Sequence, residues 1–409
     1  MNETVKILRL IARLNIGGPA IQAVDLSKEF SGNSYQTKLV CGSLSPGEGD
    51  MTYLAAEKKV EPWVIKEFGR DISLWEDLKS FFIIRKIIKD FQPDILHTHT
   101  AKAGTIGRLA ALSLRLPFGL SQKVRLVHTF HGHTFHSYFS PLKNFLFIQV
   151  EKMLGRFTDT IIVISEQQKI DICKTYRIAH KKRTRIIPLG FDLSEFAQLD
   201  RVHKKSNQKK EQGSHPEPLK IGTIGRFTAV KNHFMLLDAI NSLKLSGKID
   251  EFKFLIVGDG ELKKGFVEKA GELNLMPSLE LRSWQTDMPS VYAGLDAIAL
   301  TSKNEGTPVA LIEAMASSRP VVATAVGGVA DLLGPIKEKK AEGFLIAERG
   351  LMVQTGDANA MAQAFLYLSE NPAALQPMIQ KAREFVLTNY DRKRLISDIK
   401  ILYGELLGR

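Results

Sequence analysis

The chain has 409 residues, which is long for one ordinary domain and suggests two or three. Its composition, 44% hydrophobic and 24% charged, is that of a folded globular protein and excludes a disordered or fibrous chain. No apolar run approaches the roughly 18–20 residues that cross a bilayer. The net charge of +12 leaves an anionic partner open, whether phosphate, anionic lipid or nucleic acid.

The positive charge is concentrated in the first half of the chain. Residues 1–196 hold 28 basic and 19 acidic residues, whereas residues 219–409 hold 23 and 22. Residues 197–218 are rich in Lys and Gln and end in Pro-Glu-Pro, which is typical of a linker or long surface loop. We therefore expect an N-terminal domain over 1–196 and a C-terminal domain over 219–385.

Both halves alternate short β-branched runs with longer helical patterns, which predicts βα units on parallel sheets. The strands are predicted at 5–11, 37–42, 94–99, 124–130, 159–165, 184–189, 220–225, 252–258, 297–302, 320–324 and 343–347. Helices are predicted between them, for example at 231–246, 261–273, 308–318 and 357–370. The expected fold class is α/β: two doubly wound, Rossmann-like domains facing a central cleft, with ligands at the carboxyl ends of the strands.

The N-terminal residues favour a strand and a turn over a signal peptide. Residues 4–18 carry Arg9 and Arg13 through an apolar stretch and end in a glycine pair. The two cysteines, Cys41 and Cys173, form neither a disulfide framework nor a metal-ligand cluster. We therefore expect a cytoplasmic protein.

The sharpest chemical pattern is TSKNEGTPVALIEAMA at 301–316. A predicted strand is followed by a polar loop with Glu305, and a helix begins near Thr307 and Pro308. Glu313 lies in that helix, eight positions after Glu305, about two turns along. A helix start suits a phosphate, and a carboxylate at Glu313 could accept hydrogen bonds from a ribose diol. Two Glu residues eight apart are more often a solvated helix face, so the neighbouring turns decide.

Three further glycine turns follow predicted strands. Gly225 and Arg226 precede Lys231, and this pairs a planar guanidinium with a point charge, as a diphosphate requires. VGDGE (257–261) and TAVGGVADLL (324–333) are turns in which glycine lets the backbone approach a ligand closely. Because all of these turns lie at strand C-termini, we interpret them as one ligand site.

In this order and spacing, the motifs resemble those of the family 4 glycosyltransferases (glycosyl transferases group 1). The motifs are Glu305 to Glu313, Gly225-Arg226 with Lys231, VGDGE, and GFDLSEF at 190–196. The segments HTHTAKAG and HTFHGH resemble in particular those of bacterial members that build lipid-linked surface polysaccharide. The resemblance implies the GT-B fold, with a C-terminal helix over 386–409 packed on the N-terminal domain.

The same resemblance implies a retaining, metal-independent hexosyltransferase that uses no cofactor. Such an enzyme moves a sugar from a nucleoside-diphosphate sugar, most commonly a UDP-sugar, to a hydroxyl acceptor. The acceptor would be lipid-linked or a saccharide, in cell-surface polysaccharide or lipopolysaccharide biosynthesis. A nucleotide-sugar epimerase or phosphorylase on the same fold is the alternative. A nucleic-acid-binding protein is suggested only by the charge, and no zinc-finger, RNA-recognition or KH signature is present.

The resemblance also implies roles for single residues. Arg226 and Lys231 would grip the donor diphosphate, Glu313 would hold the ribose hydroxyls, and Glu305 would contact the donor sugar. The residues whose backbone would contact the donor phosphates are Gly17, Gly18, Gly225, Gly306, Thr307, Pro308 and Val309. An ordinary tight turn explains the glycine pair at the N-terminus equally well.

Histidines follow two predicted strands of the first half, in HTHTAKAG and HTFHGH. A metal site is the alternative reading, but no carboxylate or cysteine accompanies them at suitable spacing, so we expect no metal. The His-Gly pair at His131 resembles a family element near the donor sugar. We therefore expect His131 in the active site, with His99 and His133 behind it. His97 and His128 are expected to point into the sheet.

Two segments of the first half, 81–92 and 141–157, are amphipathic. Ile84, Ile88 and Phe91 lie along one side of the first. Such helices either contact an anionic membrane at its inner face or are ordinary core helices of an α/β domain. The basic first half favours a peripheral membrane contact.

Overall fold

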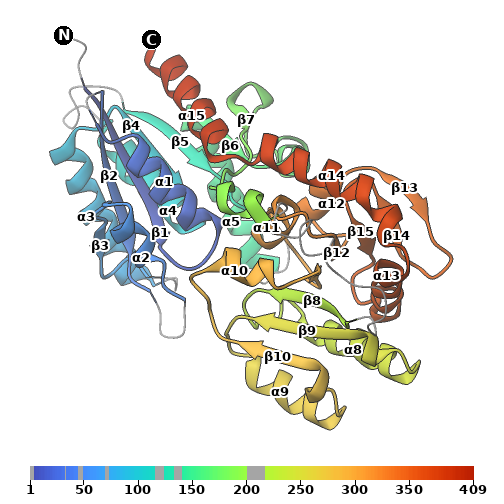
Figure 1. The fold of residues 1–409 in the computed structure, drawn as a ribbon. Coiled ribbons are helices and arrows are strands. Elements are labelled where there is room, and N and C mark those ends of the chain that lie inside the picture. Colours follow the sequence, from blue (N-terminus) through green and yellow to red (C-terminus); the bar gives the residue numbers. More distant parts are fainter. Residues whose placement is uncertain are drawn as a thin grey trace. The chain divides into compact units, whose positions relative to one another are not determined.

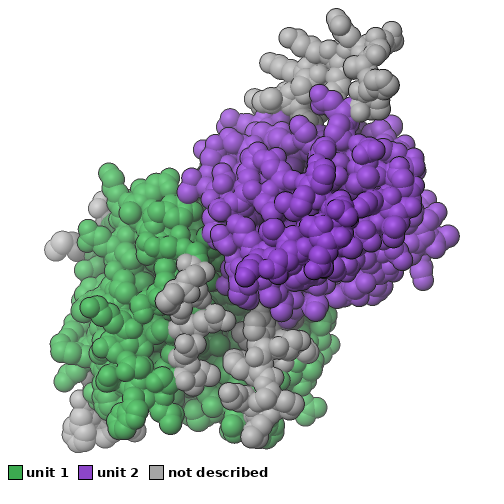
Figure 2. All heavy atoms as spheres, turned by 90° about the horizontal axis from the view of Figure 1, so that it is seen from below, with its two compact units in different colours: residues 1–191, 392–409 green, residues 192–391 purple. Residues whose placement is uncertain are grey.

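The computed structural model describes seven stretches of the chain: residues 4–32, 34–44, 49–69, 73–115, 124–132, 141–199 and 217–409. The chain divides into two compact units (Figure 2). Unit 1 consists of Met1–Phe191 and Arg392–Arg409, and unit 2 consists of Asp192–Asp391. The segment GFDLSEF therefore crosses the boundary between the units, and residues 200–216 of the expected linker lie outside the described residues.

Unit 1 contains a seven-stranded parallel sheet in the order β3-β2-β1-β4-β5-β6-β7 (Figure 1). The strands are β1 (Val5–Arg13), β2 (Tyr35–Gly42), β3 (Trp63–Ile65), β4 (Ile95–His99), β5 (Arg125–Thr129), β6 (Thr160–Val163) and β7 (Thr184–Ile186). The strand order reverses at β1, whose neighbours are β2 and β4. In such doubly wound sheets, ligands bind beyond the carboxyl ends of the strands at this reversal.

The helices of unit 1 cover both faces of the sheet. They are α1 (Gly18–Glu29), α2 (Thr52–Glu57), α3 (Leu74–Phe91), α4 (Ala101–Ser113), α5 (Pro141–Phe157), α6 (Glu166–Ile170) and α15 (Arg392–Leu407). Leu10 and Leu96 face α3 and α4, whereas Ile7 and Ile95 face α15. This alternation follows from the two-residue period of a strand. The last helix is therefore part of the core of unit 1, where Tyr403 is fully buried.

The apolar stripe of α3 belongs to the core of unit 1. Ile84, Ile88 and Phe91 are buried and pack in one cluster with residues of α4. This stripe, which the sequence offered as a membrane contact, is thus a core face. The exposed apolar side chains of α3 lie elsewhere on the helix and are Leu74, Trp75, Leu78 and Phe82. None of the helices in the described stretches is both long and apolar enough to span a membrane.

Unit 2 contains an eight-stranded sheet in the order β10-β9-β8-β11-β12-β15-β14-β13. The strands are β8 (Leu219–Ile224), β9 (Phe252–Val257), β10 (Leu279–Arg282), β11 (Ala297–Leu300), β12 (Val321–Thr324), β13 (Ile336–Lys339), β14 (Leu345–Ala347) and β15 (Leu351–Val353). Pairing is parallel except along β13, β14 and β15, which form an antiparallel edge.

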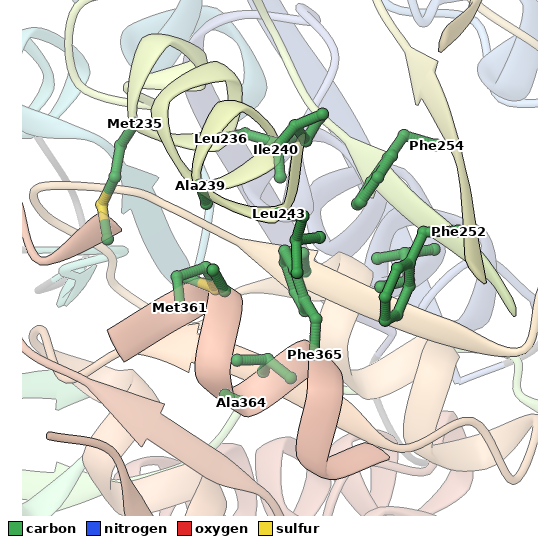
Figure 3. Close-up of a cluster of buried hydrophobic side chains, with 14 of the residues drawn as sticks. Met235, Leu236, Ala239, Ile240, Leu243, Phe252, Phe254, Met361, Ala364 and Phe365 are labelled. Carbon is green, nitrogen blue, oxygen red and sulfur yellow. The ribbon is translucent and has the colours of Figure 1, made fainter. Parts of the chain in front are cut away.

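The helices of unit 2 are α8 (His233–Leu245), α9 (Lys263–Glu272), α10 (Met288–Ala293), α11 (Val309–Ala316), α12 (Gly328–Leu333), α13 (Ala358–Glu370) and α14 (Pro372–Asn389). Figure 3 shows part of the core, where Leu243 of α8 and Phe365 of α13 lie near Phe252 and Phe254 of β9. All four side chains are buried. This packing fixes the sheet whose carboxyl ends carry the polar loops described next.

Candidate functional site

Two loops of unit 2 bring together three residues singled out in the sequence. Arg226 and Lys231 follow β8, and Glu305 follows β11. Because β8 and β11 are parallel neighbours, the loops after them lie at the same edge of the sheet. There, the Lys231 ammonium lies 2.5 Å from Glu305 Oε1 in an ion pair that the sequence did not predict.

The same two loops are tied together by further hydrogen bonds. The Ser302 hydroxyl donates to Glu305 Oε1 at 2.6 Å, so this oxygen accepts from both Ser302 and Lys231. The Lys303 amide donates to the Val230 carbonyl at 2.8 Å, and the Thr301 hydroxyl donates to the Lys231 carbonyl at 3.1 Å. The Lys231–Glu305 pair is therefore held at both ends by a fixed backbone. Ser302 carried no sequence signal beyond its place at a strand end.

Two glycines before α12 support the Glu305 loop. A Cβ atom on Gly327 would lie 2.0 Å from the Glu305 carbonyl oxygen, and one on Gly328 would lie 1.8 Å from the Gly306 carbonyl oxygen. Gly327 also has a φ of +47°, where side chains are strained. The Gly328 amide donates to the Glu305 carbonyl at 3.2 Å. Close backbone approach, and so glycine, is required here by the loop itself.

Arg226 is half-buried, and its guanidinium has no hydrogen bond or ion pair with any described residue. The backbone of its loop is held instead by contacts with Gly258 and His233. A Cβ atom on Gly258 would lie 2.0 Å from the Gly225 carbonyl oxygen, and His233 Nε2 lies 3.1 Å from the Arg226 carbonyl. The backbone at Gly225 and Arg226 is thus positioned by packing while the guanidinium keeps its five donors for an acceptor.

Glu313 lies partly buried in α11, beside a residue that the sequence reading missed. The Tyr292 hydroxyl lies 2.8 Å from Glu313 Oε2 and 3.0 Å from the Ala310 carbonyl oxygen. Burial raises the pKa of Glu313 to about 7, and the hydrogen bond from Tyr292 opposes this rise. Glu313 is therefore close to half-protonated at neutral pH.

The start of α11 contains the remaining predicted backbone positions of unit 2. Pro308 is the N-cap, so the helix begins at Val309, one residue later than Pro at the first helical position would require. No side chain caps this end of the helix. Gly306 and Thr307 precede it in the loop that carries Glu305. The first amide groups of α11 are thus available to an anion.

In unit 1, the glycine pair forms the N-terminus of α1. Gly17 is the N-cap with a φ of +151°, in the region that favours glycine, and Gly18 is buried as the first helical residue. The Gly17 amide contacts Met51 Sδ at 3.4 Å. The pair lies directly after β1, at the edge where the strand order reverses.

The histidines of β4 and the segment after β5 form a buried chain. His131 Nε2 lies 2.9 Å from His99 Nδ1, and His97 stacks on His99 with ring centroids 4.2 Å apart. Burial lowers the pKa of His131 to about 3, and burial, assisted by neighbouring positive charge, holds the pKa values of His97 and His99 well below their usual range. All three imidazoles are therefore neutral at physiological pH.

His128 points to the opposite face of the sheet, where Thr98 Oγ1 lies 2.9 Å from its Nδ1. His97 and His128 are both fully buried. His99 is fully buried as well, one layer behind His131. His133 lies outside the described residues. Within the described stretches, no group of three His, Cys, Asp or Glu side chains could hold a metal ion.

Both halves of the chain match models of known families. Residues 16–195 match the model of Glycosyltransferase Family 4, and residues 204–385 match that of Glycosyl transferases group 1. Among relatives, UDP-Gal:alpha-D-GlcNAc-diphosphoundecaprenol alpha-1,3-galactosyltransferase of Escherichia coli is 26% identical over 352 residues, which cover 86% of this chain and 85% of that protein. The capsular polysaccharide biosynthesis glycosyltransferase CapM of Staphylococcus aureus is 25% identical over 343 residues, 83% of each chain.

Solved structures share the fold over nearly the whole chain. Alr3699/HepE of Anabaena in complex with UDP and glucose superposes with a TM-score of 0.74 at 18% identity, covering 98% of this chain and 99% of that chain. At this identity the likeness establishes the fold, two Rossmann-like domains of the GT-B type. The two family models, which match residues 16–195 and 204–385, show that the chain belongs to the glycosyltransferases of the group 1 family, with a family 4 N-terminal domain.

Proposed function

We propose that the chain moves a sugar, with retention of configuration and without a metal ion, from a UDP-sugar to a hydroxyl acceptor. The acceptor is lipid-linked or a saccharide, in the synthesis of cell-surface polysaccharide or lipopolysaccharide. The observation that carries the proposal is the group of side chains at the carboxyl edge of β8 and β11. There, Lys231 pairs with Glu305, and the Arg226 guanidinium has no described partner.

The chemistry requires charge neutralisation on the departing diphosphate. Arg226 and Lys231 supply two positive charges from one edge of the sheet, and the amides at the start of α11 add partial positive charge. Donors fixed before the reaction stabilise developing negative charge without reorganisation. Two fixed cations and a helix end can thus do what a metal ion does in other transferases.

The state of Glu305 argues against a covalent glycosyl-enzyme as the route to retention. Its Oε1 accepts hydrogen bonds from Lys231 and Ser302, and an oxygen engaged in this way is a poor nucleophile. By resemblance to the family, the acceptor attacks from the face of the leaving group, and a donor phosphate oxygen takes its proton. The protein then needs no nucleophile, and Glu305 holds Lys231 in place beside the sugar.

The donor and acceptor are proposed from relatives. The Escherichia coli relative is named for a UDP-galactose donor and a diphosphoundecaprenol-linked acceptor, and it aligns over 86% of this chain. The Staphylococcus aureus relative is named for capsular polysaccharide biosynthesis. A lipid-linked diphosphate would also suit the basic first half of the chain. It would bring the protein to the inner face of the cytoplasmic membrane.

A donor screen followed by product analysis tests the proposal. A panel of nucleoside-diphosphate sugars is added to the protein, and a true donor should raise the melting temperature by mass action. We expect a UDP-sugar to give the largest rise. With that donor and a diphosphate-lipid or saccharide acceptor, NMR of the product should show the anomeric configuration of the donor, unchanged by EDTA.

Each part of the proposal can fail separately. An inverted anomeric centre would contradict retention, and loss of transfer in EDTA would contradict metal independence. Conversion of the donor sugar without release of UDP would indicate an epimerase. Transfer of the sugar to inorganic phosphate would indicate a phosphorylase.

A further inference from the structure

Arg9 is a charged side chain in the middle of β1 with 0% of its surface exposed. In the described part of the chain it has no carboxylate partner. Its Nη1 lies 3.0 Å from His97 Nδ1 and 3.3 Å from His99 Nε2. The register of the sheet produces these contacts, because Arg9 is paired with His97 on the adjacent strand β4. A buried charge is normally paired, so these contacts call for an explanation.

The guanidinium dictates which nitrogens accept a hydrogen bond. Arg has five N–H donors and no acceptor. His97 Nδ1 and His99 Nε2 must therefore accept from Arg9. A neutral imidazole has one donor nitrogen and one acceptor nitrogen, so each of these two rings carries its proton on its other nitrogen.

The neighbouring contacts agree with this assignment. His97 then carries its proton on Nε2, which lies 2.7 Å from the Thr129 hydroxyl oxygen. The Tyr403 hydroxyl lies 2.7 Å from His97 Nδ1, the accepting nitrogen. His99 carries its proton on Nδ1 and donates it to His131 Nε2 at 2.9 Å. Arg9 and Tyr403 share the single lone pair of His97 Nδ1, whereas each bond from Arg9 through His99 to His131 has one donor and one acceptor.

The series of hydrogen bonds from Arg9 through His99 ends at His131. Because Nε2 of this ring accepts from His99, its proton lies on Nδ1. That nitrogen is shielded from solvent and has no hydrogen-bond partner among the described residues. His131 follows β5, at the carboxyl edge of the sheet, where doubly wound folds bind ligands. The chain that starts at Arg9 therefore ends in an unpaired N–H donor at this edge.

We propose that Arg9 and His99 are positioning residues that fix His131 as its Nδ1–H tautomer, so that it donates a hydrogen bond to a substrate oxygen. The substrate group is a neutral acceptor, a hydroxyl or ring oxygen of a sugar. A neutral imidazole donates an oriented hydrogen bond but carries no charge to neutralise an anion. This inference rests on the proposed function in one respect, namely that His131 faces the sugar. The fixed tautomer itself depends only on the contacts within unit 1.

Fixing the tautomer ensures that His131 always presents an N–H donor, and never a lone pair, to the substrate. A free neutral imidazole exchanges its proton between two nitrogens, and one of the two forms would present a lone pair to a sugar oxygen. Arg9 cannot change its role as donor, since a guanidinium has N–H donors and no acceptor. The direction of every bond from Arg9 to His131 is thereby set. Arg9 acts through His99 and does not touch the substrate.

An isosteric pair of variants at His99 tests the inference. The side chain of His99→Asn places an amide where Nδ1 was and can still donate to His131, whereas that of His99→Asp can only accept. We expect ¹⁵N NMR of histidine-labelled protein to show His131 as the Nδ1–H tautomer in the wild type and in His99→Asn. In His99→Asp we expect the Nε2–H tautomer. His128→Asn, which alters a buried histidine on the opposite face of the sheet, is the control and should leave His131 unchanged.

Transfer assays supply the second readout. We expect kcat/KM for the donor to fall about 10-fold or more in His99→Asp and to stay within about threefold of wild type in His99→Asn and His128→Asn. A wild-type His131 in the Nε2–H form would overturn the inference even if no variant folds. Equal tautomers or equal rates in the two His99 variants would also overturn it. Absence of sugar transfer by the wild type would defeat the proposed function but would not alter the NMR result.

Discussion

The two units carry polar clusters at the carboxyl edges of their sheets, but one cluster consists of charged side chains and the other consists mainly of neutral ones. In unit 2 the side chains are charged and sit on loops, where Lys231 and Glu305 are 24% and 10% exposed. In unit 1 the side chains of His97, His99 and His131 are neutral imidazoles in and directly after the sheet, and the charge that contacts them, Arg9, is completely buried. The cluster of unit 2 presents charge to a ligand, whereas that of unit 1 presents an oriented hydrogen-bond donor.

This difference agrees with the division of labour that we propose. A diphosphate is gripped best by cations that keep their charge close to solvent, since full burial would cost several kcal/mol for each ion. A sugar is neutral and is recognised by correctly oriented donors and acceptors. Arg108 is also fully buried, but in an ion pair with the buried Glu151 at 2.7 Å, so that pair leaves the net charge of the surface unchanged.

Removal of the cations of unit 2 should have the largest effect. We expect Arg226→Ala and Lys231→Ala to lower kcat by about 10²–10³-fold, because each removes a fixed charge that stabilises the departing diphosphate. The fold should survive, since both side chains are only half-buried and lie on loops outside the core. The measurement is initial rate under saturating donor. Lys264→Ala is the matched control, because that side chain is 90% exposed on α9. A variant with near-normal kcat would contradict the assignment of its residue.

The alternation of strands and helices could be predicted because buried parallel strands are continuous apolar runs. The missed strands were those without such runs. β13 (Ile336–Lys339) is exposed at every residue, β3 and β15 have three residues each, and β10 alternates with charge. Tertiary pairing creates such edge strands, and a local pattern cannot reveal it.

Within the candidate site, the sequence placed Arg226, Lys231 and Glu305 near one another because all three follow strands. It did not reveal that Lys231 and Glu305 bind each other, or that Arg9 serves the histidines. Arg9 resembled a polar interruption of an apolar strand. Its role depends on the register of β1 against β4, which pairs it with His97. Register joins residues that lie 88 positions apart, and no short motif encodes it.

Nucleotide binding should depend on pH through unit 2. The pKa of Glu313 is raised to about 7, and only the ionised carboxylate accepts hydrogen bonds from both ribose hydroxyls. The affinity for UDP should therefore rise by about 10-fold from pH 6 to pH 8, as the ionised fraction rises. Isothermal titration at the two pH values measures this change. In Glu313→Gln the affinity should be lower and its pH dependence should be weaker than that of the wild type, leaving only the part due to ionisation of the terminal phosphate of UDP. The same pH dependence in the variant and the wild type would exclude Glu313 as a source.

Stability should respond to acid mainly through unit 1, and His128 provides the smallest and cleanest test. Burial, assisted by the Arg108 charge, holds the pKa of His128 well below its usual value of 6.5. Below pH 6.5 the unfolded chain therefore binds a proton that the folded chain does not, and the free energy of unfolding falls as pH falls. For one histidine the loss is about 1.4 kcal/mol between pH 7.5 and pH 5.5.

The variant His128→Asn should lose that much less of its free energy of unfolding on acidification than the wild type, as measured by urea denaturation at the two pH values. Packing losses in the variant are present at both pH values and cancel in the comparison. The free energy of unfolding of unit 2 should change less with acid. His233, whose pKa is lowered to about 4, makes the unit less stable as pH falls. Glu313, whose pKa is raised to about 7, makes it more stable as pH falls, and the two effects oppose each other. Equal pH dependence in variant and wild type would mean that His128 does not lower the stability in acid, and the proposed neutral state of this buried histidine would then be wrong.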